Sequence, residues 1–325
     1  MQIQKYFTKQ KMMRTVLYTL VPIYLFAIYL FGWRVLLVLA AVTIAGSLGE
    51  LWIMRMINKE KAKISEAVLV SCALFTLTLP PTIPIWIAVV GILFGVIIGK
   101  CVFGGFGQNI FNPALVARCF IYVCFPIPMT VTWANPFTGI PGGLLKWAPG
   151  VDMATTVTPM INMEMNGITT NPLNLLIGNT AGSMGETSAI LIIIAGIYLV
   201  YTKTANWKIM ASVLGSALVS STVLYLVKQT PYTPLFSMLS GGLLFASVFM
   251  ATDPISAPSR DKAKIIFGIL IGTLAVILRT YSLFTEGIMF AVLIGNSFAP
   301  LIDRNVKIWE AKQKEKLAQA GGAKA

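Results

Sequence analysis

Apolar runs of about 20 residues, the length of a transmembrane helix, recur along the whole chain and limit its possible folds more than any other feature. Of the 325 residues, 56% are hydrophobic and 11% are charged, whereas a soluble domain carries about 25% charged residues. Backbone polar groups in a bilayer must be bonded within a helix or a closed barrel. Because the runs are continuous rather than alternating, we expect helices and an all-α polytopic membrane protein.

The hydrophobic pattern predicts ten transmembrane helices. Several of the segments are short, and short or interrupted segments are typical of the broken helices that surround a binding site. The predicted segments are 15–31, 35–54, 67–79, 85–99, 111–125, 187–201, 209–227, 235–251, 265–278 and 287–302.

Basic residues fix the expected orientation of these segments. They cluster before the first segment and after the second, fourth, sixth, eighth and tenth segments. With ten spans, all of these clusters lie on one side together with both termini, and the positive-inside rule makes that side cytoplasmic. Lys146, Lys228 and Arg279 are the main basic residues on the opposite side. The net charge of +13 therefore reflects topology and does not by itself indicate a nucleic-acid partner.

The residue types exclude several kinds of chemistry. The chain has no histidine, which excludes histidine-ligated haem, histidine zinc sites and a histidine general base. Its four cysteines lack the spacing of an iron–sulfur or zinc site, and we expect them to be small buried apolar residues.

A short pattern recurs in the fifth and tenth segments. Both contain Asn-x-Phe-x-Pro, which begins at Asn109 and at Asn296. We therefore predict two five-helix repeats, 1–125 and 187–304, inverted with respect to each other, with an extracytoplasmic insert at 126–186 and a cytoplasmic tail at 305–325. In inverted repeats, a site or pathway forms where discontinuous helices meet.

Four residues are candidates for an ion pathway. Glu50 and Arg118 lie deepest among the charged residues, and intramembrane charges are costly unless they serve a function. Asn109 and Asn296 could coordinate an ion or satisfy freed backbone groups. The alternatives are structural pairing or an interfacial position for the charges, and helix capping for the asparagines.

A threonine-rich turn, "VDMATTVTPM", stands out within the insert. Asp152 can accept hydrogen bonds from the turn, Thr155 and Thr156 offer hydroxyls, and Pro159 holds the chain extended just after Thr158. From the residues alone, this stretch could also be a purely structural Asx/Thr turn.

The turn resembles the flavin-attachment motif found in the membrane D-subunit of Rnf complexes and in the membrane B-subunit of sodium-pumping NADH:quinone reductases. That motif runs Asp-x-x-(Ser/Thr)-(Gly/Ser/Thr)-Ala-Thr. Asp152, Thr155 and Thr156 match its earlier positions and Thr158 matches the FMN acceptor, whereas Val157 replaces the usual alanine. The blocks "GGFGQNIFNPALVAR", "SGGLLFASVFMATDPISAP" and "GIMFAVLIGNSFAPLIDR" carry the resemblance over the whole chain.

The resemblance implies a specific function. A separate flavin transferase would esterify FMN to Thr158 on the extracytoplasmic side of a prokaryotic cell membrane. A second, non-covalent flavin, riboflavin, would also be bound. Electrons would pass to flavin and iron–sulfur subunits of the complex while sodium or protons cross the membrane. The compact chain is more similar to the D-subunit of the ferredoxin:NAD+ oxidoreductase (Rnf), with a urea-transporter-like fold.

Two other functions fit the sequence. A passive small-solute transporter or channel of urea-transporter-like fold would need the repeats but not the threonine turn. An assembly scaffold would need neither flavin nor redox chemistry.

Overall fold

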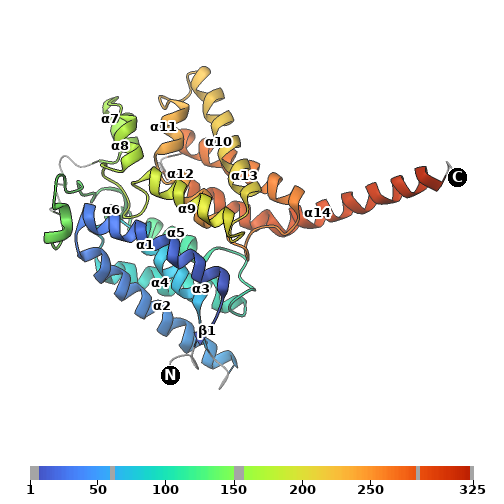
Figure 1. Cartoon of the computed structure of the whole chain (residues 1–325), viewed down its shortest axis with the longest axis horizontal. Helices are drawn as coiled ribbons and strands as arrows, with labels where there is room; N and C mark the ends of the chain where they lie inside the picture. Colours follow the sequence, from blue (N-terminus) through green and yellow to red (C-terminus); the bar gives the residue numbers. More distant parts are fainter. Residues whose placement is uncertain (1–6, 59–62, 150–156, 283–285, 323–325) are drawn as a thin grey trace.

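Helices make up most of the structure (Figure 1). The computed structural model describes residues 7–58, 63–149, 157–282 and 286–322. Among these residues, five helices are long and apolar enough to cross a membrane: Lys11–Phe31, Arg34–Ile57, Ile85–Phe103, Trp207–Leu226 and Asp261–Tyr281. Three shorter apolar helices accompany them. The chain is therefore a helical membrane protein, as the composition predicted.

The first half of the chain, residues 7–125, contains the helices predicted there. Two-residue parallel strands, β1 (Phe7–Thr8) and β2 (Ile64–Ser65), join its N-terminal segment to the loop before α3. Its helices are α1 (Lys11–Phe31), α2 (Arg34–Asn58), α3 (Glu66–Leu77), α4 (Ile85–Gly99), the 3-10 turn η3 (Cys101–Phe103) and α5 (Pro113–Cys124).

The insert and the second half complete the chain. The insert, 126–186, contains four short elements: α6 (Pro126–Thr130), η4 (Gly142–Leu145), α7 (Pro159–Asn166) and α8 (Pro172–Ile177). The second half, residues 187–304, contains α9 (Ala189–Tyr201), α10 (Trp207–Leu226), α11 (Pro234–Leu239), α12 (Leu243–Phe245), the π-helical turn η5 (Ala246–Met250), α13 (Asp261–Tyr281) and the start of α14 (Ile288–Gly322). The predicted eighth segment is thus broken into three pieces.

The two halves share a packing order. In the first half α2 packs on α4 and α4 on α5, and in the second half α10 packs on α13 and α13 on α14. Small residues permit these close contacts. A Cβ at Gly95 of α4 would lie 2.6 Å from the Ala117 Cβ of α5, and one at Gly272 of α13 would clash with α10. Contacts of α1 with α9 and of α5 with α14 join the halves.

The Asn-x-Phe-x-Pro pattern occupies different places in the two helices. Pro113 is the first residue of α5, and the side chain of Asn112, rather than Asn109, caps that helix by accepting from the Ala114 N–H. Pro300 instead lies inside α14, which continues through it to Gly322. Proline there removes one backbone hydrogen bond without ending the helix. The predicted tail from residue 305 is therefore, as far as residue 322, a direct extension of α14, and it projects from the body (Figure 1).

We name the two ends of the molecule the Thr158 end and the basic end. The Thr158 end carries α6, η4, α7 and α8, and the segment before α9 is fixed there because the Met184 and Gly185 N–H groups donate to the Leu79 and Leu77 carbonyls at 3.0 and 2.7 Å. The basic end carries the N-terminus of α3 and the C-terminus of α9. Lys100 directly follows α4, and Lys203 lies two residues after the end of α9.

Candidate functional site

Thr158 lies at the point where α7 begins. It is the N-cap residue of α7, its backbone is extended, and its Oγ1 accepts a long 3.4 Å hydrogen bond from the Ile161 N–H. Pro159 follows as the first helical residue, where its missing N–H is not needed. Asp152, Thr155 and Thr156 lie outside the described residues. The structure therefore locates the predicted acceptor hydroxyl but not the rest of its motif.

A small cavity of about 40 Å³ opens beside Thr158. It is lined by residues of the insert, of the turn before α12 and of the connection before α14, among them Thr158, Met160, Glu186, Gly241, Gly242 and Glu286. Thr158 therefore shares this cavity with two carboxylates that sequence reasoning did not assign to the site.

Those carboxylates belong to a buried ionic cluster centred on Arg118 of α5. Arg118 Nη1 donates to Glu186 Oε1 at 2.6 Å, and Nη2 forms an ion pair with Glu286. The Arg118 side chain is 3% exposed, and the Ser183 hydroxyl accepts a further, long bond from Nη2 at 3.4 Å. One guanidinium thus joins the first half, the insert and the connection that leads into α14. This geometry favours structural pairing over a free charge in a path.

A double-glycine turn connects the cluster to α7. Gly241 and Gly242 both have positive φ, 64° and 69°, a conformation that favours glycine. A Cβ on Gly241 would lie 2.5 Å from the Met160 sulfur, and one on Gly242 would lie 2.7 Å from the Glu186 carboxyl carbon. The turn therefore packs closely between α7 and the Arg118 cluster.

Arg279 of α13 holds that turn in place. Its guanidinium is buried and donates to the carbonyls of Ser237, at 2.9 Å, of Ser240 and of Gly241. These carbonyls lie at and just past the end of α11, where backbone acceptors lack intrahelical partners and attract a cation. Arg279 is one of the basic residues that departed from the charge pattern, and this contact explains why it is there.

Glu50 belongs to a second buried ionic cluster, at the basic end. Glu50 Oε1 lies 2.7 Å from Lys100 Nζ, and both side chains are 2% exposed. Ser65 donates its N–H and its hydroxyl to the two Glu50 oxygens at 2.9 and 2.8 Å, and Lys100 donates to the same hydroxyl at 2.6 Å. Glu50 is therefore fully paired by residues that the sequence did not indicate.

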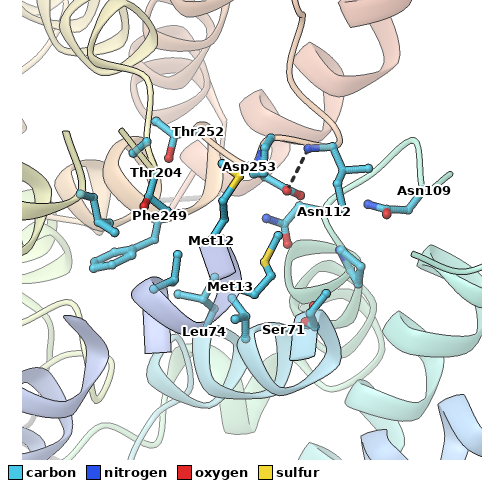
Figure 2. A pocket seen from close by; sticks show the side chains of 18 of the residues that line it. Met12, Met13, Ser71, Leu74, Asn109, Asn112, Thr204, Phe249, Thr252 and Asp253 are labelled. Atoms are coloured by element: carbon cyan, nitrogen blue, oxygen red, sulfur yellow. Dashed lines mark hydrogen bonds between the residues drawn. The ribbon is translucent and has the colours of Figure 1, made fainter. Parts of the chain in front are cut away.

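A pocket at the basic end lies between the two halves (Figure 2). Figure 2 shows Met13, Ser71 and Asn112 from the first half facing Phe249 and Asp253 from the second. The cavity volume of this pocket is about 50 Å³. One Asp253 carboxylate oxygen accepts from the Ile255 N–H at 3.2 Å, drawn as the dashed line.

The two predicted asparagines differ in their surroundings. Asn109 lines the basic-end pocket, and its Nδ2 donates to the Phe111 carbonyl at 3.0 Å. Asn296 is fully buried within α14, and among the described residues neither its Oδ1 nor its Nδ2 has a hydrogen-bond partner. Pro300, four residues later, also deprives the Asn296 carbonyl of its helical donor. Asn296 therefore does not cap a helix start.

Comparison with known proteins identifies the family. Residues 2–310 match the model of the NQR2, RnfD, RnfE family. The chain belongs to this family. Among its relatives, the B-subunit of the Na(+)-translocating NADH-quinone reductase of Pseudomonas aeruginosa is 38% identical over 284 residues, which are 84% of this chain and 67% of the relative.

Proteins of the same name in other bacteria are similarly related. That of Stutzerimonas stutzeri is 38% identical over 83% of this chain and 66% of the relative, and that of Klebsiella pneumoniae is 37% identical over 78% and 63%. Each matched region thus covers about two thirds of the relative's length. Membership in the NQR2, RnfD, RnfE family confirms the family resemblance predicted from the sequence.

Proposed function

We propose that this chain is the membrane subunit of an Rnf-type ion-translocating ferredoxin:NAD+ oxidoreductase and that it carries FMN as a phosphoester on Thr158. The observation that carries the proposal is the position of Thr158. Its hydroxyl stands at the first turn of α7, half-buried beside a cavity, within a sequence that matches the attachment motif of the family.

The helix terminus at Thr158 fits a phosphoryl group, and Arg118 pairs with the two carboxylates that line the same cavity. The first N–H groups of a helix have no intrahelical partners, and a helix N-terminus attracts an anion. The Met160 and Ile161 N–H groups are therefore available to the phosphate oxygens, which would replace the weak bond that Oγ1 now accepts. The flavin supplies the redox chemistry when bound, and the chain supplies position, insulation and electrostatic tuning.

The membrane arrangement is part of the proposal. We place ten spans in two inverted repeats, with the basic end in the cytoplasm and Thr158 outside. The shared packing order of α2, α4 and α5 and of α10, α13 and α14 supports the repeats. The charge distribution supports the orientation.

We propose that the chain also binds a second, non-covalent flavin, riboflavin, and that its polar contacts come from the basic-end pocket, which at about 50 Å³ has to widen between the two halves to admit the ring. Ligand pockets are mostly apolar, with a few polar groups that fix orientation. Asn109, Asn112, Thr204 and Asp253 supply donors and acceptors there, against an apolar wall that includes Phe249. Our assignment gives Asn109 a role at a ligand, while Glu50 and Arg118 act as structural partners and Asn296 stays a candidate for the ion pathway.

Attachment of FMN is tested by co-expressing the chain with a flavin transferase and recording flavin fluorescence in a denaturing gel. We expect a fluorescent band that T158A abolishes and that T138A, a change at an exposed threonine of the same insert, leaves intact. Peptide mass spectrometry over residues 147–165 would locate the FMN. A band that survives T158A would overturn the assignment, and the absence of any band would favour the passive transporter or the scaffold.

The redox partners are tested in the assembled complex. The relatives are named as NADH–quinone reductase subunits, so quinone reduction is the alternative to ferredoxin:NAD+ electron transfer. We expect electron transfer between ferredoxin and NAD+ in membranes that contain the other Rnf subunits, coupled to movement of sodium or protons. Quinone-dependent NADH oxidation without ferredoxin activity would assign the chain to the other branch of the family.

A further inference from the structure

A groove on the Thr158 end, distinct from the small cavity beside Thr158, has no role in the function described so far. We call it the Tyr232 groove. It has a volume of about 550 Å³ and is lined mainly by Met163, Asn171, Pro172, Leu175, Tyr232 and Phe236. Helices α7, α8 and α11, which contribute to it, lie at the same end of the molecule (Figure 1).

The floor of the groove is aromatic and apolar. Tyr232 and Phe236 line it while they are only 4% and 8% exposed, and their rings stack with centroids 5.8 Å apart and planes 14° apart. Leu235, which is 58% exposed, forms part of its wall. An aromatic floor with an exposed apolar wall is suited to a flat, conjugated ring.

The polar groups of the groove lie on its rim. Thr169, Thr170 and Asn171 line it and offer hydroxyl and amide groups. The Tyr232 hydroxyl donates to Glu164 Oε2 at 3.4 Å. Burial, helped by the Glu164 carboxylate, raises the pKa of the Tyr232 phenol to about 12, so the phenol stays neutral near pH 7. The groove therefore offers a neutral floor and a hydrogen-bonding rim.

Helix α7 connects the groove to the attachment point. Thr158 caps α7 and Met163, five residues later, lines the groove, which corresponds to a rise of about 7.5 Å along the helix axis. Met160, between them, packs in one buried cluster with Leu175, Tyr232 and Phe236. A chain that starts at the Thr158 oxygen and follows α7 therefore reaches the groove.

We infer that the Tyr232 groove is the seat of the isoalloxazine ring of a flavin tethered at Thr158. The inference rests on the proposed function, because it requires the tether. The cavity directly beside Thr158 holds about 40 Å³, which is room for about one water molecule and too little for a tricyclic ring. The groove has a volume typical of small-molecule sites. The ribityl chain would span the distance between them.

The test uses the full chain loaded with FMN by co-expression, and it compares Y232L with the unsubstituted protein. Gel fluorescence after denaturation reports attachment. Flavin emission of the native protein and its quenching by iodide report the environment of the ring, and the signal of T158A is subtracted from both as background. We expect Y232L to keep full attachment, to raise native emission severalfold and to increase iodide quenching, because the ring loses its stacked floor.

A matched control and a milder variant complete the design. Y225L, at a partly exposed tyrosine of α10 outside the groove, should leave both signals unchanged. L235Q removes an exposed apolar wall without disturbing the core and should change native emission in the same direction as Y232L. Full attachment with unchanged emission and quenching in both Y232L and L235Q would overturn the groove assignment alone. Absence of attached flavin from the unsubstituted chain would overturn the proposed function, and the groove assignment with it.

Discussion

The two buried ionic clusters neutralise their charged side chains in different ways. Glu50 and Lys100 are partners within the first half, and Ser65 donates to both Glu50 oxygens, including the one that the lysine contacts. Arg118 instead binds two carboxylates from other parts of the chain, and among the described residues its Nε has no partner. Each of these buried charges thus has a counter-charge, one from within the same half and the other from other parts of the chain.

Removal of the Arg118 guanidinium should have the largest effect. R118M leaves Glu186 and Glu286 buried together without a counter-charge, and breaking one buried pair costs about 3–5 kcal/mol. We expect a loss of stability of about 5 kcal/mol or more, measured by detergent-denaturant titration of the purified chain. R55M, a change at an exposed arginine of α2, serves as the control. An R118M protein as stable as R55M would contradict a role of Arg118 in joining the halves.

The Glu50–Lys100 pair should behave as a local unit. K100M leaves the Glu50 carboxylate buried without a counter-charge, and we expect a loss of about 3 kcal/mol in the same titration. The double variant E50L/K100M should recover most of that loss, because an apolar pair of similar volume can replace a buried ion pair. If the double variant instead loses ion-coupled electron transfer while it stays folded, Glu50 acts in the ion path and not only in structure.

Asn296 should show the smallest effect and the opposite sign. Replacement of Asn296 by leucine, which has a similar size, removes a buried amide whose two polar atoms lack partners among the described residues. We therefore expect N296L to gain about 1 kcal/mol of stability. N109L should lose about 1 kcal/mol, because it breaks the bond to the Phe111 carbonyl. A loss of stability in N296L would show that the amide has a partner in the membrane. A gain accompanied by loss of ion transport would place Asn296 on the pathway.

Much of the fold could be predicted from the sequence because hydrophobic runs and helix boundaries are local properties. Each of the ten predicted segments contains helix, and α4 has the predicted bounds, Ile85–Gly99. The eighth segment was not predicted to break into α11, α12 and η5, although the Gly241–Gly242 pair within it is a local signal. Helices α7 and α8 were also missed, although each begins at a capping residue followed by proline, Thr158–Pro159 and Asn171–Pro172.

The candidate site was only partly predictable, because its partners come from distant parts of the chain. The turn motif indicated Thr158 through local spacing alone. Glu186 and Glu286 are 68 and 168 residues from Arg118, and no local pattern relates residues at such separations. A general signal did exist: Arg279 and Glu286 are charged residues beside apolar segments on the side of the molecule that is otherwise poor in basic residues.

The separations within the Arg118 cluster have a consequence for biosynthesis. A ribosome makes the chain from its N-terminus, and domains generally form in that order. Lys100 is synthesised 50 residues after Glu50, so the local pair can form while the first half is still being inserted. Arg118 meets its second carboxylate only once residue 286 has been made, 168 residues later. We therefore expect the Arg118 charge of α5 to stay incompletely neutralised during synthesis. The two halves can then pack together through this cluster only when translation is nearly complete.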